Sequence, residues 1–273
     1  TVNHDDLWSF EGKNVPIHWH NDLEINLIRE GEAVFQVYQK SYRVRTGEGF
    51  LLNRNVPHSC SSPGNEHVRY STILVRPDFL YGDFGSDVER KCFQPFLQNS
   101  AIPCIHLTGF DENGKEILWK LNQVEEAFDR KRFCYELKIK GLLCEAFAMI
   151  LYGHRQELTK FVPANLQELE RLEKMLNYLN MHFTEVISLQ DLADQVHLSR
   201  EVCCRLFKKM TGKTITGYLE EYRVNKSFSL VQSGQYSMTQ ITEMVGFSNP
   251  SRFASAFRKR FGCNPGEYNS VKH

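Results

Sequence analysis

The second half of the sequence contains an internal repeat. Residues 192–199 (LADQVHLS) align with residues 241–248 (ITEMVGFS) at an offset of 49, and residues 205–212 align with residues 255–262 at an offset of 50. In each copy, apolar residues at helical spacing lie on both sides of a short turn, which predicts two helices joined by that turn. The repeat therefore restricts this half of the chain to a helical domain with two helix-turn-helix units.

The turn and cap residues agree with this interpretation. The residue after the first helix needs positive φ, which Gly246 adopts without steric cost and His197 can tolerate. Ser199 and Ser248 are expected to cap the second helix of each unit. The predicted core positions of the two copies are Leu192, Val196, Leu198, Cys203, Phe207, Ile241, Val245, Phe247, Phe253 and Phe257.

Charge is distributed unevenly, although the net charge of the chain is zero. Residues 164–273 hold 14 Lys and Arg against 11 Asp and Glu, whereas residues 1–163 hold 19 against 22. The other face of each second helix is polar and basic, with an excess of arginine and lysine. Opposite signs in the two halves indicate that the C-terminal half is the one that meets a polyanion such as DNA.

The first half has a different pattern. Runs rich in Val, Ile, Phe and Tyr at residues 25–28, 33–38, 50–52 and 70–75 alternate with polar residues and are separated by Gly and Pro. This pattern predicts a small antiparallel β-barrel or sandwich. From 114 to 151 the apolar residues fall at helical spacing, which predicts a hairpin of two helices. We expect three regions: domain 1–153, linker 154–165 and helical domain 166–273.

Several classes of protein are disfavoured. No apolar run approaches the roughly 20 residues of a membrane-spanning helix, and the first residues (TVNHDD) do not resemble an export signal. The eight cysteines form no C-x-x-C pair, so we expect reduced core residues and no structural zinc site. These features predict a cytoplasmic protein with no membrane partner.

The helical half resembles the DNA-binding domain of the AraC/XylS family of bacterial transcription regulators. The resemblance covers residues 166–273 and is carried by residues 241–248 (ITEMVGFS), 252–262 (RFASAFRKRFG) and 265–268 (PGEY). It implies an α+β protein of two domains, with a cupin-like sensor followed by two helix-turn-helix units that enter successive major grooves of promoter DNA. It also implies a homodimer formed by the helical hairpin and contact with RNA polymerase.

The resemblance places DNA contacts on the second helix of each unit. The base-facing candidates are Arg200, Glu201, Cys204 and Arg205 in the first unit and Asn249, Pro250, Ser251, Arg252 and Ser255 in the second. We expect Arg205 to read a guanine, because its planar fork can meet O6 and N7 together. The phosphate-contacting candidates, nearer the helix ends, are Lys208, Lys209, Arg258 and Lys259.

A histidine motif lies in the first half. The spacing Gly12-x5-His18-x-His20-x3-Glu24-x6-Gly31 resembles the first motif of the cupin barrel, and His58 after Pro57 resembles the end of the second. In metal-bearing cupins the matching residues bind an ion, so His18, His20, Glu24 and His58 are candidate ligands for a divalent transition metal. The second motif departs from the pattern, because it lacks a glycine before His58 and an asparagine after it.

The sequence leaves two roles open for these four residues. We favour the polar lining of a pocket for a small molecule such as a sugar, with Trp19 as an aromatic face for that ligand, over a metal site. The predicted function is a transcription factor without catalytic activity that responds to this small molecule. The alternative is a metal-dependent cupin sensor or enzyme fused to a DNA-binding domain.

Overall fold

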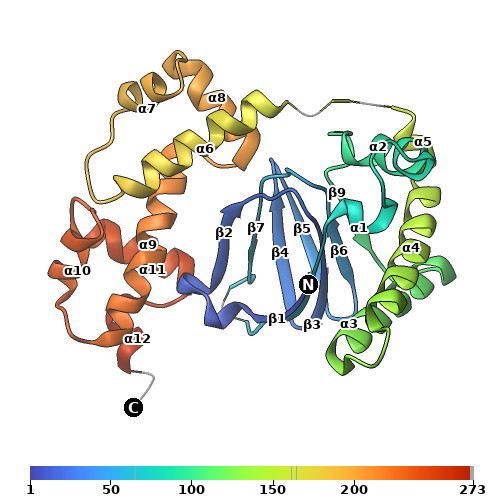
Figure 1. Ribbon diagram of the computed structural model, residues 1–273. Coiled ribbons are helices and arrows are strands. Elements are labelled where there is room, and N and C mark those ends of the chain that lie inside the picture. The colour runs from blue at the N-terminus through green and yellow to red at the C-terminus, as the bar shows by residue number, and fades with distance from the viewer. Residues whose placement is uncertain (65, 161, 164, 271–273) are drawn as a thin grey trace.

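The computed structural model describes residues 1–64, 66–160, 162–163 and 165–270. Within them a β-sandwich lies at the centre, with a helical hairpin on one side and a group of helices on the other (Figure 1). The predicted α+β architecture of a sheet domain followed by an all-helical domain is confirmed. No helix within the described ranges is long and apolar enough to cross a membrane.

The sandwich consists of two antiparallel sheets. The five-stranded sheet has the order β1 (Val2–Asp6), β8 (Arg69–Val75), β3 (Leu23–Glu30), β6 (Gly49–Leu52) and β9 (Cys104–Leu107). The four-stranded sheet has the order β2 (Asn14–His18), β7 (His58–Ser61), β4 (Glu32–Val37) and β5 (Lys40–Arg45). Short helices join the strands: η1 (Leu7–Ser9), η2 (Glu11–Lys13), α1 (Pro77–Tyr81), η3 (Glu89–Phe93) and α2 (Gln94–Leu97).

Strand β3 separates the two cores of this domain. Leu23 and Leu27 pack into the core that contains the helical hairpin, whereas Ile28 packs between the two sheets with Phe35 and Phe50. Because side chains alternate along a strand, residues an even number of positions from Ile28 also face the space between the sheets. A carboxylate at position 24 therefore enters the sandwich instead of facing solvent.

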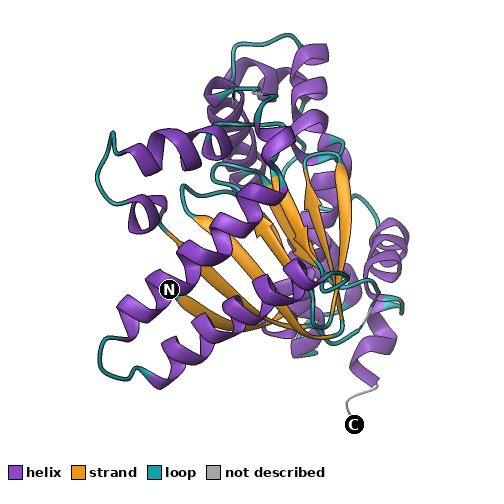
Figure 2. Cartoon of the chain, turned by 90° about the vertical axis from the view of Figure 1, so that its right-hand side faces the viewer, coloured by secondary structure: helices purple, strands orange, loops and turns teal. Residues whose placement is uncertain are grey.

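The helical hairpin predicted from residues 114–151 is present as α3 (Glu112–Arg130) and α4 (Tyr135–Gly153). It covers the outer face of the five-stranded sheet, as Figure 2 shows. Leu121 and Phe147 are among the buried residues of this contact. Each such side chain contributes about 1.5–3 kcal/mol through the removal of apolar surface from water.

The helical domain contains the predicted repeat. Its helices are α6 (Leu166–Met181), α7 (Leu189–Gln195), α8 (Arg200–Thr211), α9 (Ile215–Ser233), α10 (Met238–Met244), α11 (Pro250–Phe261) and α12 (Pro265–Ser270). The first unit, α7 and α8, and the second unit, α10 and α11, have separate apolar cores joined by α9. Of the ten predicted core positions nine are buried, and Leu198 is half-buried.

The turns confirm the predicted backbone. His197 has φ 52° and Gly246 has φ 77°. A Cβ atom on Gly246 would lie 2.7 Å from the Cα atom of Thr184, so this turn packs closely against the loop between α6 and α7. Ser199 caps α8 as expected, because its side chain accepts a hydrogen bond from the Val202 N–H.

The predicted cap at Ser248 is wrong. The cap of α11 is Asn249, whose side chain accepts a 2.7 Å hydrogen bond from the Arg252 N–H. Pro250 occupies the first position of the helix, where its fixed φ favours helix initiation. The second turn is thus one residue longer than the first, which explains why the repeat offset changes from 49 to 50.

The segment between the domains is only partly irregular. A single helical turn, α5 (Arg155–Leu158), lies within the predicted linker, and Pro163 forms an isolated β-bridge with Asn99 of the sensor domain. Residues 161 and 164 of the linker and residues 271–273 of the helical domain lie outside the described residues.

The cysteine prediction needs a correction. All eight are free thiols, but Cys92 and Cys134 are exposed instead of being part of the core. Cys92 lies in η3, and Cys134 lies at the start of α4, on the tip of the hairpin, where neither has a core to enter.

Two of the contacts between the domains lie at the ends of α8 and α11. In the first unit, Gly212 at the end of α8 lies against Tyr38 and Gln36, which follow or belong to β4. In the second unit, Arg260 near the end of α11 donates a 2.7 Å hydrogen bond to the carbonyl of Gly12. Both recognition helices are therefore held at their C-terminal ends by the sandwich.

The contact at Gly212 can be tested against its repeat equivalent, Gly262. Both residues have positive φ, 72° and 78°, so alanine costs about 1–2 kcal/mol at either. Only at Gly212 does the added Cβ atom approach the sensor domain, 2.5 Å from the Tyr38 carbonyl oxygen; at Gly262 nothing lies within 4 Å. We expect Gly212→Ala, but not Gly262→Ala, to speed proteolysis of the linker and enlarge the radius of gyration. Identical behaviour of the two variants would contradict this interface.

Candidate effector site and nucleic-acid interface

The structure brings the four cupin-motif residues together. His18 ends β2 and is the cross-strand partner of His58, which begins β7. His20 lies in the following loop, and Glu24 enters from β3 of the opposite sheet. One ligand atom from each side chain lies within 4.8 Å of the others. Residues from two sheets thus form a compact group that the spacing alone had indicated.

The three imidazole rings are oriented in the same way, because each Nδ1 lies within hydrogen-bond distance of the backbone carbonyl of a residue two positions away. The distances are 2.9 Å from His18 to Pro16, 3.0 Å from His20 to Asp22 and 2.8 Å from His58 to Val56. Since a carbonyl oxygen only accepts hydrogen bonds, each Nδ1 carries the proton. The Nε2 atoms of neutral rings are then left as acceptors for another group.

The Nε2 atoms of two rings approach the same carboxylate oxygen. His20 Nε2 lies 2.8 Å from Glu24 Oε2, and His58 Nε2 lies 3.4 Å from it. His58 Nε2 is buried and has no hydrogen-bond partner among the described atoms. In both rings Nδ1 already carries the proton, so in a neutral ring Nε2 is an acceptor that faces a carboxylate oxygen, which is also an acceptor. Each contact therefore requires either a second proton on the ring or a cation shared by Nε2 and the carboxylate.

The pKa shifts of these side chains agree with close contacts between the carboxylate and the rings. Burial raises the pKa of Glu24, but its contacts with His20, His58 and Asn26 outweigh burial and hold that pKa well below its usual value. The hydrogen bond to Glu24 raises the pKa of His20. Burial, followed by the neighbouring His58, lowers the pKa of His18 to about 4, so this ring is neutral near pH 7.

A second set of polar contacts orients the carboxylate. Asn26 Nδ2 donates a 2.7 Å hydrogen bond to Glu24 Oε1, and Asn26 Oδ1 accepts a 3.1 Å hydrogen bond from the Thr72 hydroxyl. Such outer partners fix the position of a ligand side chain at metal sites. Asn26 was not among the residues predicted from the sequence, although its position two residues after Glu24 puts it on the same face of β3.

This donor set fits a divalent transition metal. Three imidazole nitrogens and one carboxylate oxygen are ligands that zinc, iron, manganese, nickel and copper accept. The orphaned His58 Nε2 and the carbonyl-bound Nδ1 atoms are the features expected of histidines that bind a metal through Nε2. The core between the two sheets is formed by Phe35, Phe50 and their apolar neighbours.

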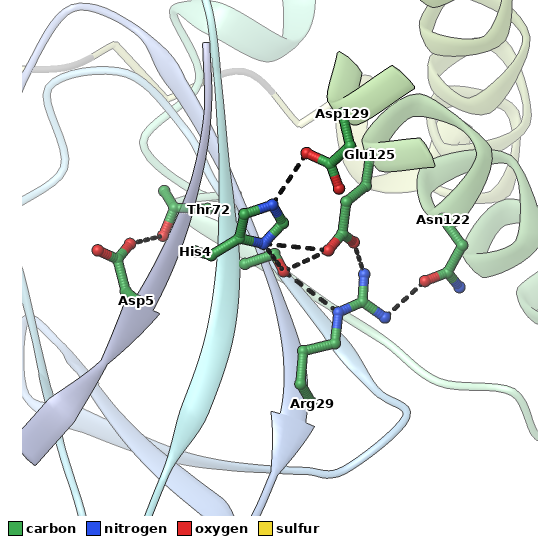
Figure 3. A network of polar contacts seen from close by, with 8 residues as sticks. His4, Asp5, Arg29, Thr72, Asn122, Glu125 and Asp129 are labelled. Atoms are coloured by element: carbon green, nitrogen blue, oxygen red, sulfur yellow. Dashed lines mark hydrogen bonds and ion pairs between the residues drawn. The ribbon is translucent and has the colours of Figure 1, made fainter. Parts of the chain in front are cut away.

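A second cluster has possible ligand atoms but a different environment. His4 of β1 lies 3.0 Å from Asp129 and 3.3 Å from Glu125, both on α3 (Figure 3). Arg29 of β3 forms an ion pair with Glu125 and donates a 2.6 Å hydrogen bond to Asn122. Its guanidinium neutralises the carboxylate and repels a metal cation. These contacts instead fasten α3 to the five-stranded sheet.

Trp19, the candidate stacking residue, lies at the domain interface. It follows β2 between His18 and His20, and its side chain packs against the apolar core of the first helix-turn-helix unit. Ile17 and Tyr38 of the sensor domain join it there. The segment that carries two of the possible ligands is therefore in direct contact with the DNA-binding half.

The candidate DNA-contacting residues lie on α8 and α11 or at their caps. All of them are exposed except Cys204, which is half-buried against the core of the first unit. Lys209 and Arg252 are paired within the chain: Lys209 lies 2.6 Å from Glu168 of α6, and Arg252 lies 3.0 Å from Glu220 of α9. Neither carboxylate partner was predicted from the sequence, because they lie 41 and 32 residues away along the chain.

Comparison with known proteins gives matches to both halves. The model of the AraC-like ligand binding domain matches residues 7–103, and a helix-turn-helix domain model matches residues 192–270. The transcriptional activator RhaR of Mannheimia succiniciproducens is 31% identical over 268 residues, covering 93% of this chain and 87% of that protein. An uncharacterized regulator, YdeC of Bacillus subtilis, is 28% identical over 258 residues, covering 94% and 87%.

Among solved structures, ToxT from Vibrio cholerae is 16% identical and covers 99% of this chain and 98% of that one, with a TM-score of 0.44.

Proposed function

Because the chain belongs to the AraC family of transcriptional regulators, we propose that it controls transcription at promoter DNA in the cytoplasm in response to a divalent transition metal. His18, His20, Glu24 and His58 hold the ion in this proposal. The observation that carries it is the convergence of their ligand atoms within 4.8 Å, with all three Nδ1 atoms bound to backbone carbonyls.

The electrostatics of the group favour a cation over a neutral organic ligand. When bound, the ion supplies the positive charge that lets Glu24 and the Nε2 atoms face each other without repulsion. A sugar needs space as well as polar groups, and Phe35 and Phe50 are fully buried in the core between the two sheets. The carbohydrate effector expected from the sequence stays a prediction. The proposed role of the metal is regulatory and not catalytic.

The position of Trp19 supports a route from the site to DNA. His18 and His20 flank Trp19, whose side chain packs on the first helix-turn-helix unit. Any change in how the two histidines are held changes where this side chain can sit. The ion can shift the equilibrium between two domain arrangements by as much as its affinity for them differs.

The recognition helices supply the DNA contacts in this proposal. The exposed N-terminal residues of α8 and α11 face bases, and the cations nearer the helix ends contact phosphates. The face of the hairpin that does not contact the sheet forms a homodimer, for which Trp119, Phe133 and Leu137 are exposed by 56%, 99% and 71%. The proposed contact with RNA polymerase is supported by family membership alone.

Metal content tests the effector site. The full-length protein, purified without a polyhistidine tag or chelators, should contain about one equivalent of a transition metal by elemental analysis. His20→Ala and His58→Ala should lose it, because each removes one of the few ligands. His4→Ala is the matched control, since it alters the cluster that Arg29 already neutralises. A wild-type protein that neither contains nor takes up such an ion would refute the proposed effector.

Trp19→Ala tests the coupling between the metal site and DNA binding, because Trp19 packs on the first helix-turn-helix unit. The variant should retain the metal, but adding or removing the metal should no longer change its affinity for an operator selected from genomic fragments. A metal-dependent affinity equal to that of the wild type would contradict this route.

Salt dependence tests the DNA contacts. Arg205→Ala should cost about 1–3 kcal/mol at the operator and relax the preference at one base. Lys208→Ala should weaken binding to all sequences and lower the salt slope by about one. Lys209→Ala should lower it less, because Glu168 already neutralises this lysine. Equal slopes for wild type and Lys208→Ala would place that helix end away from the phosphates.

Oligomeric state tests the hairpin. Light scattering after gel filtration should show a dimer for the wild type and a monomer for Leu137→Glu, since a buried charge without a partner opposes association. Val186→Glu is the control, because Val186 is also exposed to solvent but lies in the loop between α6 and α7. Dimers in both variants would show that the subunits meet elsewhere.

A further inference from the structure

The first turn of α11 contains an arginine, Arg252, whose side chain is hydrogen-bonded to a carboxylate of another helix. Arg252 is the third residue of the helix, and its side chain is 61% exposed. Its Nε and Nη2 atoms both donate to one oxygen of Glu220, at 3.2 and 3.0 Å. Glu220 belongs to α9, the helix that joins the two units, and its side chain is 33% exposed. One edge of the guanidinium is therefore fixed to the scaffold.

This arrangement leaves the rest of the guanidinium available. Nη1 and the second N–H of Nη2 have no part in the contact with Glu220. Two adjacent N–H donors match O6 and N7 of guanine, the commonest base-specific contact of arginine in the major groove. The N-terminal residues of a recognition helix are the ones that reach base edges. Arg252 has the position and the free donors for this contact.

We propose that Glu220 is a positioning residue that makes Arg252 the guanine reader of the second helix-turn-helix unit. This rests on the proposed DNA-binding function of α11. A flexible arginine must lose rotamer freedom when it meets a base, whereas one already held by a carboxylate has lost part of it before binding. Specificity at one base pair then depends on a residue that does not touch the DNA.

The surroundings assign Glu220 to Arg252 and not to a neighbour. Arg223, the other cation beside this pair, donates instead to the backbone carbonyls of Phe183 and Glu185, at 2.6 and 2.7 Å. These bonds tie α9 to the loop before the first unit and so hold the helix that carries Glu220.

The first unit has a different reader. Val202 occupies the position that matches Arg252, and Arg205 lies about one helical turn later. The ion pair of the first unit, between Glu168 and Lys209, lies at the C-terminal end of α8, opposite to the end where Arg252 lies in α11. A carboxylate that holds a base-facing arginine is thus found in the second unit and not in the first, among the residues that the structure describes.

The test uses the full-length protein and a random-sequence DNA duplex library, with the bound sequences read after selection. The wild type should select a guanine at one position of one half-site. Arg252→Ala should reduce the preference there about tenfold. Glu220→Gln should reduce the same preference about three- to tenfold, without weakening binding to random DNA, because the arginine keeps its charge. In the Arg252→Ala background, Glu220→Gln should have no further effect at that base.

Glu168→Gln is the matched control, because it releases Lys209 at the far end of α8 and should keep the wild-type base preference. The proposal is overturned if Glu220→Gln keeps the full guanine preference, or if it loses preference equally at all positions with a lower melting temperature, as a general structural role requires. A wild type that selects no sequence would overturn the DNA-binding function as well, which separates the two failures.

Discussion

The pairing of β2 with β7 is the interaction on which both halves of the molecule depend. It places His18 directly opposite His58, and the chain that leaves β2 then carries Trp19 onto the first helix-turn-helix unit and His20 back to Glu24. The residues just before β2 contact the second unit through the Gly12 carbonyl. One short strand thus has the proposed metal ligands beside it and an interdomain contact at each end, so these residues cannot rearrange without affecting the interface.

The sequence predicted the parts of the fold whose signal is local. Periods of two and 3.6 residues located four strands, the hairpin and both helix-turn-helix units, and the residue types in the turns predicted positive φ at His197 and Gly246. Strand β2 escaped notice because it is five residues long, contains Pro16 and depends on a partner about forty residues away. The cap at Asn249 was missed because the alignment of the repeat hides a one-residue insertion in the turn.

The candidate sites show the same limit. The histidine motif predicted a group of four residues, and the backbone places them together, but the orientation of the rings depends on carbonyls that no spacing reveals. Exposure of the recognition helices followed from their amphipathic pattern. Their ion pairs did not, because Glu168 and Glu220 reach them from α6 and α9 across more than thirty residues of chain.

These ion pairs change how the charge of the DNA-binding half acts. Its surplus of Lys and Arg is small, and Lys209, Lys213 and Arg252 each face a carboxylate of the same chain. A paired cation adds little to the long-range field but has a defined orientation, whereas an exposed cation that forms no ion pair with another described residue, such as Lys208, adds field without fixed geometry. In the proposed DNA interface, the paired Arg252 of the second unit reads a base, while exposed cations such as Lys208 attract the DNA. An effector that moves α9 against α11 can then alter what Arg252 reads without removing that attraction.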